Sequence, residues 1–198
     1  MKTEIEVKFV DIEIENIRNR LKEVGAVLEQ PMRLMRRALI DNEALDARHA
    51  FLRIRDEGDR TTMTFKQFDE NSLTGAKELA IDISDFNTAL QILEQFELRH
   101  RTLQESRRET WRYNNVEVVI DEWPWINPYI EIEGETEESV KQTADLLGFD
   151  WSEAMFGSVD VIYQRDYPHM SVRGVIDVAE VRFSDNVPRE FGERVDGS

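Results

Sequence analysis

The stretch Glu4-Ile5-Glu6-Val7-Lys8-Phe9, near the start of the printed sequence, alternates charged and apolar residues. Successive side chains of a β-strand point to opposite faces, so a strand here would have one charged and one apolar face. Two neighbouring carboxylates suit a hard cation such as Mg²⁺ or Mn²⁺, and a nearby lysine can bind a phosphate oxygen. A half-buried strand with a solvated charged face explains the same pattern. Repetition on other strands is what would favour a binding surface.

The same alternation recurs on other expected strands. Residues 51–55 and 62–66 carry basic residues on one face, and residues 129–133 repeat the acidic pattern of the first stretch. The charged positions on these faces, in chain order, are Glu4, Glu6, Lys8, Arg53, Arg55, Lys66, Glu78, Asp82, Arg108, Asp121, Glu131 and Glu133. Packing alone does not require acidic pairs at both ends of a set of strands with basic residues between them. The repetition therefore favours strands that turn their charged faces toward a shared interior.

Short turns between the strands predict hairpins and an antiparallel sheet. Helices are expected after Asp11 as N-cap, after Ser84 or Asp85, and over 135–147 and 152–164, with a further strand over 175–183. Eight main strands are expected over residues 4–9, 33–41, 51–55, 61–68, 77–83, 101–113, 116–122 and 129–133. The expected fold class is α+β, an eight-stranded antiparallel closed β-barrel with helices packed on the outside.

Composition excludes several classes of protein. The 198 residues suit one domain with a proper core. The formal net charge of −16 repels nucleic acid and anionic membrane, so neither is an expected partner. The absence of cysteine excludes disulfides and thiolate chemistry, and His49, His100 and His169 form no metal-ligand spacing. No signal peptide or membrane-length apolar run is evident, so a cytoplasmic location is expected.

Several motifs, in their order and spacing, resemble one known family. They are Glu4-x-Glu6-x-Lys8, Phe51-Leu52-Arg53-Ile54-Arg55, Thr64-Phe65-Lys66, Lys77-Glu78, Val118-Val119-Ile120-Asp121 and Ile130-Glu131-Ile132-Glu133-Gly134. Together they resemble the signature of the CYTH domain, the triphosphate tunnel metalloenzymes, a family named for bacterial class IV adenylate cyclase and thiamine triphosphatase. The resemblance covers roughly residues 1–165. We therefore expect a CYTH-like domain over 1–170 and a C-terminal extension over 171–198 that is partly a polar tail.

The resemblance implies a tunnel of eight antiparallel strands that binds a triphosphate between basic side chains and holds divalent metal on acidic ones. By matching position, the triphosphate-binding residues would be Lys8, Arg53, Arg55, Lys66 and Arg108, and Lys77 and Arg37 are further candidates for the same role. The ligands of one or two Mg²⁺ or Mn²⁺ ions would be Glu4, Glu6, Asp121, Glu131 and Glu133. The residues expected to take part directly in catalysis are Glu4, Glu6 and Lys8.

Three positions depart from the family pattern and bear on the substrate more than on the fold. Ser106 stands where the family often has a lysine, two residues before Arg108. Ala80 interrupts the acidic alternation of the fifth strand. The second strand carries arginines where members often have acid and tyrosine, so Arg37 could replace the missing cation, with Arg36 as the alternative by register.

The resemblance leaves three functions open. A phosphohydrolase would cleave inorganic triphosphate or a small organic triphosphate, such as thiamine triphosphate or a nucleoside triphosphate, with water oriented by Glu4 or Glu6. A class IV adenylate cyclase would convert ATP to cyclic AMP and pyrophosphate and would need a purine pocket. Trp123, Trp125 and Tyr129 could stack on a purine, although hairpin packing is the favoured explanation.

The third open function is a non-enzymatic polyphosphate-binding module. The nearly complete set of acidic residues argues against it, because binding alone needs cations more than metal-holding carboxylates. In each case the expected partner is a small-molecule triphosphate. The sequence also leaves a homodimer open.

Overall fold

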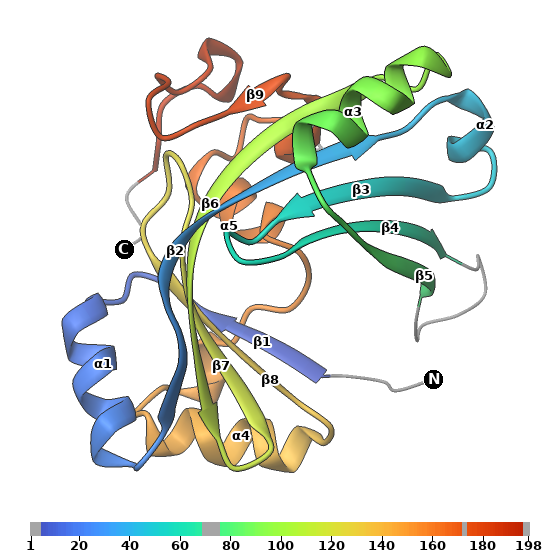
Figure 1. Cartoon of the computed structure of the whole chain (residues 1–198). Coiled ribbons are helices and arrows are strands. Elements are labelled where there is room, and N and C mark those ends of the chain that lie inside the picture. Colours follow the sequence, from blue (N-terminus) through green and yellow to red (C-terminus); the bar gives the residue numbers. More distant parts are fainter. Residues whose placement is uncertain (1–4, 69–75, 172–173, 196–198) are drawn as a thin grey trace. The chain divides into compact units, whose positions relative to one another are not determined.

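The computed structural model of the chain describes residues 5–68, 76–171 and 174–195 (Figure 1). Nine strands are described: β1 (Ile5–Phe9), β2 (Val27–Ile40), β3 (Ala50–Asp56), β4 (Thr61–Phe68), β5 (Ala76–Ile83), β6 (His100–Tyr113), β7 (Val116–Glu122), β8 (Tyr129–Gly134) and β9 (Glu180–Val181). The α-helices are α1 (Ile14–Glu23), α2 (Glu43–Asp46), α3 (Phe86–Gln95), α4 (Glu137–Leu146) and α5 (Asp160–Asp166). Short 3₁₀ helices cover Trp151–Glu153, Gly174–Asp177 and Arg189–Phe191.

The chain divides into two compact units, which are described separately. The first unit contains residues 34–105 and 175–182, and the second contains residues 2–33, 106–174 and 183–198. The long strands β2 and β6 each contribute one part to each unit. The strand order is β1-β8-β7-β6-β2-β3-β4-β5, and β9 pairs with β6 in parallel.

The core of the second unit lies between the apolar face of its sheet and the helices α1 and α4. Val7 and Ile132 are directly opposite each other in the pairing of β1 with β8, and both are fully buried. Leu21 from α1 and Val140 from α4 belong to the same cluster. Fully burying a side chain of this size contributes roughly 1.5–3 kcal/mol. Because side chains alternate along a strand, this packing turns the charged residues to the other face.

The first unit has the same two-faced plan, with α3 covering the apolar side of its sheet. Ile54 of β3 and Ala38 of β2 are fully buried, and Phe86, Leu90 and Leu93 of α3 join their cluster. The Asp85 carboxylate caps α3 by accepting a hydrogen bond from the Thr88 amide at 2.7 Å. The helix expected after Ser84 or Asp85 is therefore α3, and it begins directly after Asp85.

The expected closed barrel is wrong, although the α+β class and the antiparallel strands are confirmed. Within the described residues, β1 and β5 are the two ends of the strand order and do not pair. The outer edge of β1 is occupied at Lys8, whose amide donates to the Met155 carbonyl at 2.9 Å and whose carbonyl accepts from the Met155 amide at 3.0 Å. A strand edge that already pairs with another segment is not available there to a further strand.

Three local expectations also differ from the structure. Asp11 does not cap α1, because it has a φ of 56° and its carboxylate is held by Arg165 and Asn127. The helix expected over 152–164 is divided into the 3₁₀ turn at 151–153 and α5, with Gly157 at a φ of 113° between them. The strand expected over 175–183 is reduced to the two residues of β9. None of the helices in the described parts of the chain is long and apolar enough to span a membrane.

Candidate active site

The charged face of the second unit is assembled by strand register. Glu6 lies opposite Glu133 and Lys8 lies opposite Glu131 in the pairing of β1 with β8. Residues directly opposite each other in antiparallel strands share a face of the sheet. Asp121 of β7 lies opposite both Tyr129 of β8 and Arg108 of β6, which extends the same face by two strands. We call this set the acidic face: Glu6, Lys8, Arg108, Asp121, Tyr129, Glu131 and Glu133.

Lys8 lies at the centre of the acidic face and is only 2% exposed. Its Nζ lies 2.6 Å from Glu6 Oε1 and 3.0 Å from Glu131 Oε2. Burial alone would lower the pKa of the Lys8 ammonium, but the two carboxylates outweigh burial and raise this pKa above its ordinary value. Lys8 is therefore a buried cation whose charge is fixed by the acidic groups around it.

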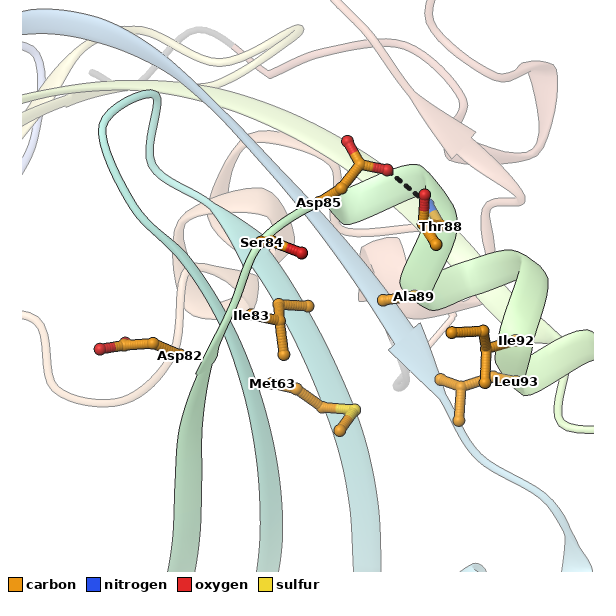
Figure 2. Close-up of a pocket in the computed structure, with 9 residues that line it drawn as sticks. All are labelled: Met63, Asp82, Ile83, Ser84, Asp85, Thr88, Ala89, Ile92 and Leu93. Atoms are coloured by element: carbon orange, nitrogen blue, oxygen red, sulfur yellow. Dashed lines mark hydrogen bonds between the residues drawn. The ribbon is translucent and has the colours of Figure 1, made fainter.

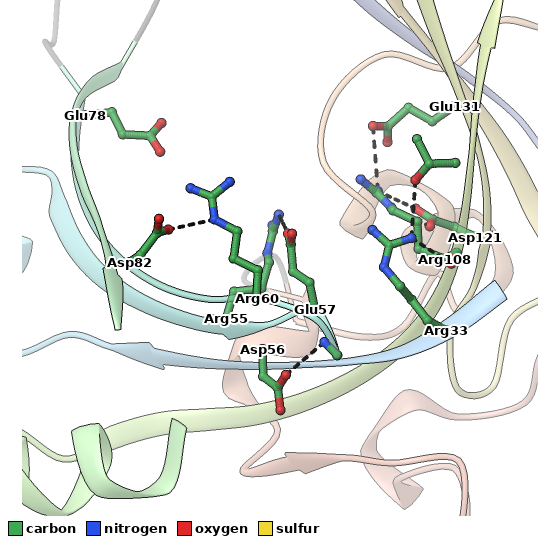
Figure 3. Close-up of polar contacts among 12 residues, drawn as sticks. Arg33, Arg55, Asp56, Glu57, Arg60, Glu78, Asp82, Arg108, Asp121 and Glu131 are labelled. Atoms are coloured by element: carbon green, nitrogen blue, oxygen red, sulfur yellow. Dashed lines mark hydrogen bonds and ion pairs between the residues drawn. The ribbon is translucent and has the colours of Figure 1, made fainter. Parts of the chain in front are cut away.

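Arg108 and the buried Asp121 form a bidentate, partly buried ion pair. The Arg108 Nε and Nη2 atoms donate to the two Asp121 carboxylate oxygens at 2.7 and 2.6 Å, and Glu131 Oε1 lies 3.8 Å from Nη2 (Figure 3). Burial opposes the charge, yet Asp121 and Glu131 together raise the pKa of Arg108 well above its ordinary value. The paired geometry fixes the guanidinium plane in a way that a single contact would not.

Glu131 and Tyr129 are two buried ionisable groups of the acidic face whose pKa values are raised. Burial is the largest cause that raises the pKa of Glu131; Arg108 and Lys8 oppose this effect, while Asp121 and Glu6 add to it. Burial also raises the pKa of Tyr129 well above its ordinary value, with further contributions from Asp121 and Glu131. In both cases burial is the largest cause, so the negatively charged forms of Glu131 and Tyr129 are disfavoured on this face.

Three carboxylates of the acidic face are close enough to share a cation. One oxygen from each of Glu6, Glu131 and Glu133 can be chosen so that all three lie within 4.8 Å of one another. Carboxylate oxygens are the preferred protein ligands of Mg²⁺ and Mn²⁺, so this donor set fits the ion that the sequence predicts. Asp121 instead lies against Arg108, and Glu4 falls outside the described residues.

The charged face of the first unit is likewise set by register. Arg37 lies opposite Arg55, and Phe51 of β3 lies opposite Lys66 of β4. Arg53 lies two residues from Arg55, so it occupies the same face of β3. We call this set the basic face: Arg37, Arg53, Arg55 and Lys66. The predicted cations of β2, β3 and β4 are therefore brought together.

Acidic side chains accompany the cations of the first unit. Lys66 Nζ lies 3.1 Å from Glu78 Oε2, and Arg55 Nη1 lies 3.4 Å from Glu57 Oε1. Lys77 pairs with Gln67 in the strand register, while its side chain falls outside the described residues.

The structure separates the two arginines that the sequence left open on the second strand. Arg36 forms an ion pair with Asp56 at 2.6 Å, and its guanidinium lies 5.0 Å from the centre of the Phe86 ring of α3. Arg36 therefore belongs to the helix-covered side of the sheet. Arg37 shares the face of Arg55, which favours Arg37 over Arg36 as the additional cation.

Two residues near the acidic face were not assigned to the site from sequence. Arg33 reaches the Arg108 carbonyl and the Thr110 hydroxyl, each at 3.4 Å (Figure 3). Its even spacing from Arg37 is a signal that places both on one face of β2. Tyr129 is 1% exposed beside Asp121, whereas the sequence left it between packing and purine stacking.

A groove on the helix-covered side of the first unit is distinct in character from both charged faces. Its volume is about 400 Å³, and its floor is formed by Met63, Ile83, Ala89, Ile92 and Leu93 (Figure 2). Asp82, Ser84, Asp85 and Thr88 complete its lining. This lining contains no basic side chain, so the groove offers no cation to a triphosphate.

Comparison with known proteins identifies the family. The CYTH domain model matches residues 2–154, and the chain belongs to the CYTH domain family. The resemblance inferred from the motifs is thereby confirmed. Among curated protein sequences none matches this chain.

Several solved structures have a fold similar to that of this chain. A "putative adenylate cyclase" from Vibrio parahaemolyticus has a TM-score of 0.68 at 13% identity, covering 81% of this chain and 97% of that one. A conserved hypothetical protein from Pyrococcus furiosus has a TM-score of 0.62 at 18% identity, covering 77% and 95%. A protein from Pyrococcus horikoshii has a TM-score of 0.60 at 19% identity, covering 77% and 94%. At these identities the similarity establishes the fold.

Proposed function

We propose that this CYTH-family chain is a metal-dependent phosphohydrolase that cleaves a phosphoanhydride bond of inorganic triphosphate or of a small organic triphosphate. The observation that carries the proposal is the acidic face, where three carboxylates suited to a divalent ion surround a buried lysine. A purely structural sheet face gains little from burying Lys8 and Glu131 together, because desolvation offsets most of the attraction between them.

Phosphoryl transfer requires positioning and charge neutralisation more than covalent participation by the protein. On the acidic face, Lys8 and Arg108 would bind phosphate oxygens, with Arg33 as a third cation. On the basic face, Arg37, Arg53, Arg55 and Lys66 would do the same. Fixed cations aimed at phosphate oxygens stabilise the charge that shifts toward the leaving phosphate in the transition state.

Glu6, Glu131 and Glu133 would hold Mg²⁺ or Mn²⁺, which when bound supplies Lewis-acid neutralisation of phosphate charge. Glu6 is the preferred group to orient the attacking water and accept its proton, since its side chain is 42% exposed whereas that of Glu131 is 11% exposed. The water oxygen forms the new bond to phosphorus, the bridging P–O bond breaks, and the phosphate or pyrophosphate product leaves with the bridging oxygen. Lys8, in contact with Glu6, would hold the phosphoryl oxygens during this exchange.

The aromatic residues near β8 support hydrolysis over cyclisation of ATP. Trp123 is 7% exposed, and Tyr129 is almost fully buried. The Trp125 indole donates to the Asp185 carbonyl at 2.8 Å and meets the Phe191 ring edge-on. These rings are therefore engaged in packing, and stacking on a purine would require them to leave it.

The test is a screen of metal against substrate with the full chain. Inorganic triphosphate, thiamine triphosphate and ATP are each incubated with Mg²⁺, Mn²⁺ or chelator, and phosphate, pyrophosphate and cyclic AMP are measured. We expect metal-dependent phosphate release from a triphosphate, strongly reduced in Glu6→Gln and retained in Glu23→Gln, which removes an exposed carboxylate at the end of α1. Cyclic AMP and pyrophosphate from ATP would support the cyclase instead, and tight binding without turnover would support a polyphosphate-binding module.

A further inference from the structure

Arg37 of the basic face is anchored by a neutral side chain. Its Nε donates to the Oε1 atom of Gln104 at 2.6 Å. Gln104 lies on β6 and is 2% exposed, and both residues belong to the first unit. The bond fixes one edge of a guanidinium that shares its sheet face with Arg55.

The Gln104 amide has one orientation that satisfies both of its neighbours. Its Nε2 donates to the Val175 carbonyl at 3.2 Å, while its Oε1 accepts from Arg37. A carbonyl can only accept a hydrogen bond and a guanidinium can only donate one. If the amide were reversed, its oxygen would face the Val175 carbonyl and its NH₂ group would face the Arg37 guanidinium, and neither contact would be a hydrogen bond. The Val175 carbonyl therefore determines which Gln104 atom Arg37 meets.

The segment that supplies this carbonyl lies beyond the CYTH match, which ends at residue 154. Residues 174–181 are held along β6 by the pairing of β9 with Leu103 and Gln104, and the Leu103 amide donates to the Ala179 carbonyl at 2.9 Å. The Asp177 carboxylate accepts from Arg101 at 2.6 Å, and Val175 is fully buried. This part of the C-terminal extension is thus an integral part of the first unit.

We propose that Gln104 is a positioning residue that orients the Arg37 guanidinium for binding a triphosphate, and that residues 174–181 fix the Gln104 amide for this purpose. The inference rests on the proposed function, because it assigns Arg37 to triphosphate binding on the basic face. It adds a residue and a segment that the sequence motifs did not single out.

The test compares two substitutions at one position. Gln104→Glu keeps an acceptor for Arg37 but adds a negative charge, whereas Gln104→Leu has a similar size and provides neither hydrogen bond. Binding of inorganic triphosphate with Mg²⁺, together with KM and kcat for its hydrolysis, is measured at low and high ionic strength. Gln67→Glu is the matched control, because Gln67 of β4 lies opposite Ala50 on the other face of the sheet.

We expect Gln104→Glu to raise KM about tenfold, equivalent to roughly 1.4 kcal/mol, with a smaller change in kcat. Added salt should reduce the difference in KM between Gln104→Glu and the wild type, because it screens the new charge. Gln104→Leu should raise KM by a smaller factor. In an Arg37→Met background the Gln104→Glu effect on KM should be smaller, since the part of it that acts through the Arg37 guanidinium is lost.

The outcomes separate this inference from the proposed function. If the wild type binds and hydrolyses triphosphate but Gln104→Glu behaves like Gln67→Glu, only the positioning role is overturned. If Gln104→Leu raises KM as much as Gln104→Glu does, and both variants lose activity in proportion to a fall in melting temperature, then Gln104 has a packing role and the inference is wrong. If the wild type neither binds nor hydrolyses triphosphate, the proposed function is overturned and the inference with it.

Discussion

The ion pairs of the acidic face and the Arg60–Asp82 pair of the first unit differ in how far their charged side chains are buried. On the acidic face Lys8 and Asp121 are almost completely buried and make short contacts to fixed partners. In the first unit the neighbouring pair Arg60 and Asp82 is largely exposed, with side chains 59% and 69% accessible. Buried pairs are geometrically fixed and costly to break, whereas exposed pairs exchange readily with water and ligands. The comparison indicates that the ion pairs of the acidic face are preorganised and that the Arg60–Asp82 pair of the first unit is more adaptable.

The largest expected effect comes from removing one charge of a partly buried pair. Asp121→Asn leaves the partly buried Arg108 guanidinium beside a neutral amide, and we expect a loss of about 1.5–3 kcal/mol in the free energy of unfolding. Asp82→Asn is the matched change in the first unit, and we expect little loss there because its partner Arg60 is solvent-exposed. Urea denaturation of the metal-free proteins measures both. Similar losses in the two variants would remove the contrast between the faces.

A smaller effect is expected from removing cations of the basic face. Lys66→Ala and Arg53→Ala should each raise KM for a triphosphate about tenfold and also lower kcat, because phosphate charge is present in the ground state and shifts in the transition state. Arg36→Ala removes an arginine from the helix-covered side, where it pairs with Asp56 and lies over Phe86. Steady-state kinetics should show wild-type KM for Arg36→Ala. Wild-type kinetics in the other two variants would exclude the basic face from substrate binding.

A pH dependence of stability should distinguish the acidic face. Burial raises the pKa of Glu131, so the folded protein binds this proton more tightly than the unfolded chain does. The contribution of protonated Glu131 to the free energy of unfolding is therefore present at low pH, and it is lost as pH rises through the raised pKa. Thermal melts with chelator across a pH series should show this decline in the wild type and not in Glu131→Gln. Parallel curves for the two proteins would show that Glu131 titrates as an ordinary carboxyl.

The sequence predicted the strands well because each follows from a local pattern. The alternation in 4–9 and 129–133 places Glu6, Lys8, Glu131 and Glu133 on one face, and the register of β1 with β8 agrees. Their roles in metal and substrate binding stay predictions. The alternation on β2 was also sufficient to separate Arg37 from Arg36 once the register to β3 was known.

The remaining features depend on contacts between distant segments. Closure of the barrel was expected from the number of strands, but the edge of β1 is occupied by Met155. No local sequence pattern predicts that bridge. The role of residues 174–181 was equally hidden, because the hydrogen bond from Gln104 to Val175 joins positions 71 residues apart. The expected boundary at residue 170 stays a prediction, although residues on both sides of it contribute to the second unit.

The most direct test of the account is a thermal melt of wild type and Glu131→Gln with chelator, with Mn²⁺, and with Mn²⁺ plus inorganic triphosphate. A ligand at 100 times its Kd stabilises the folded state by about 2.7 kcal/mol, so the wild-type melting temperature should rise with Mn²⁺ and rise further with triphosphate. Glu131→Gln should lose most of the Mn²⁺ shift, because it removes one carboxylate of the group formed with Glu6 and Glu133, while Glu23→Gln should keep it. Equal shifts in wild type and Glu131→Gln, or no shift in the wild type, would contradict the assignment of this face as the metal-triphosphate site.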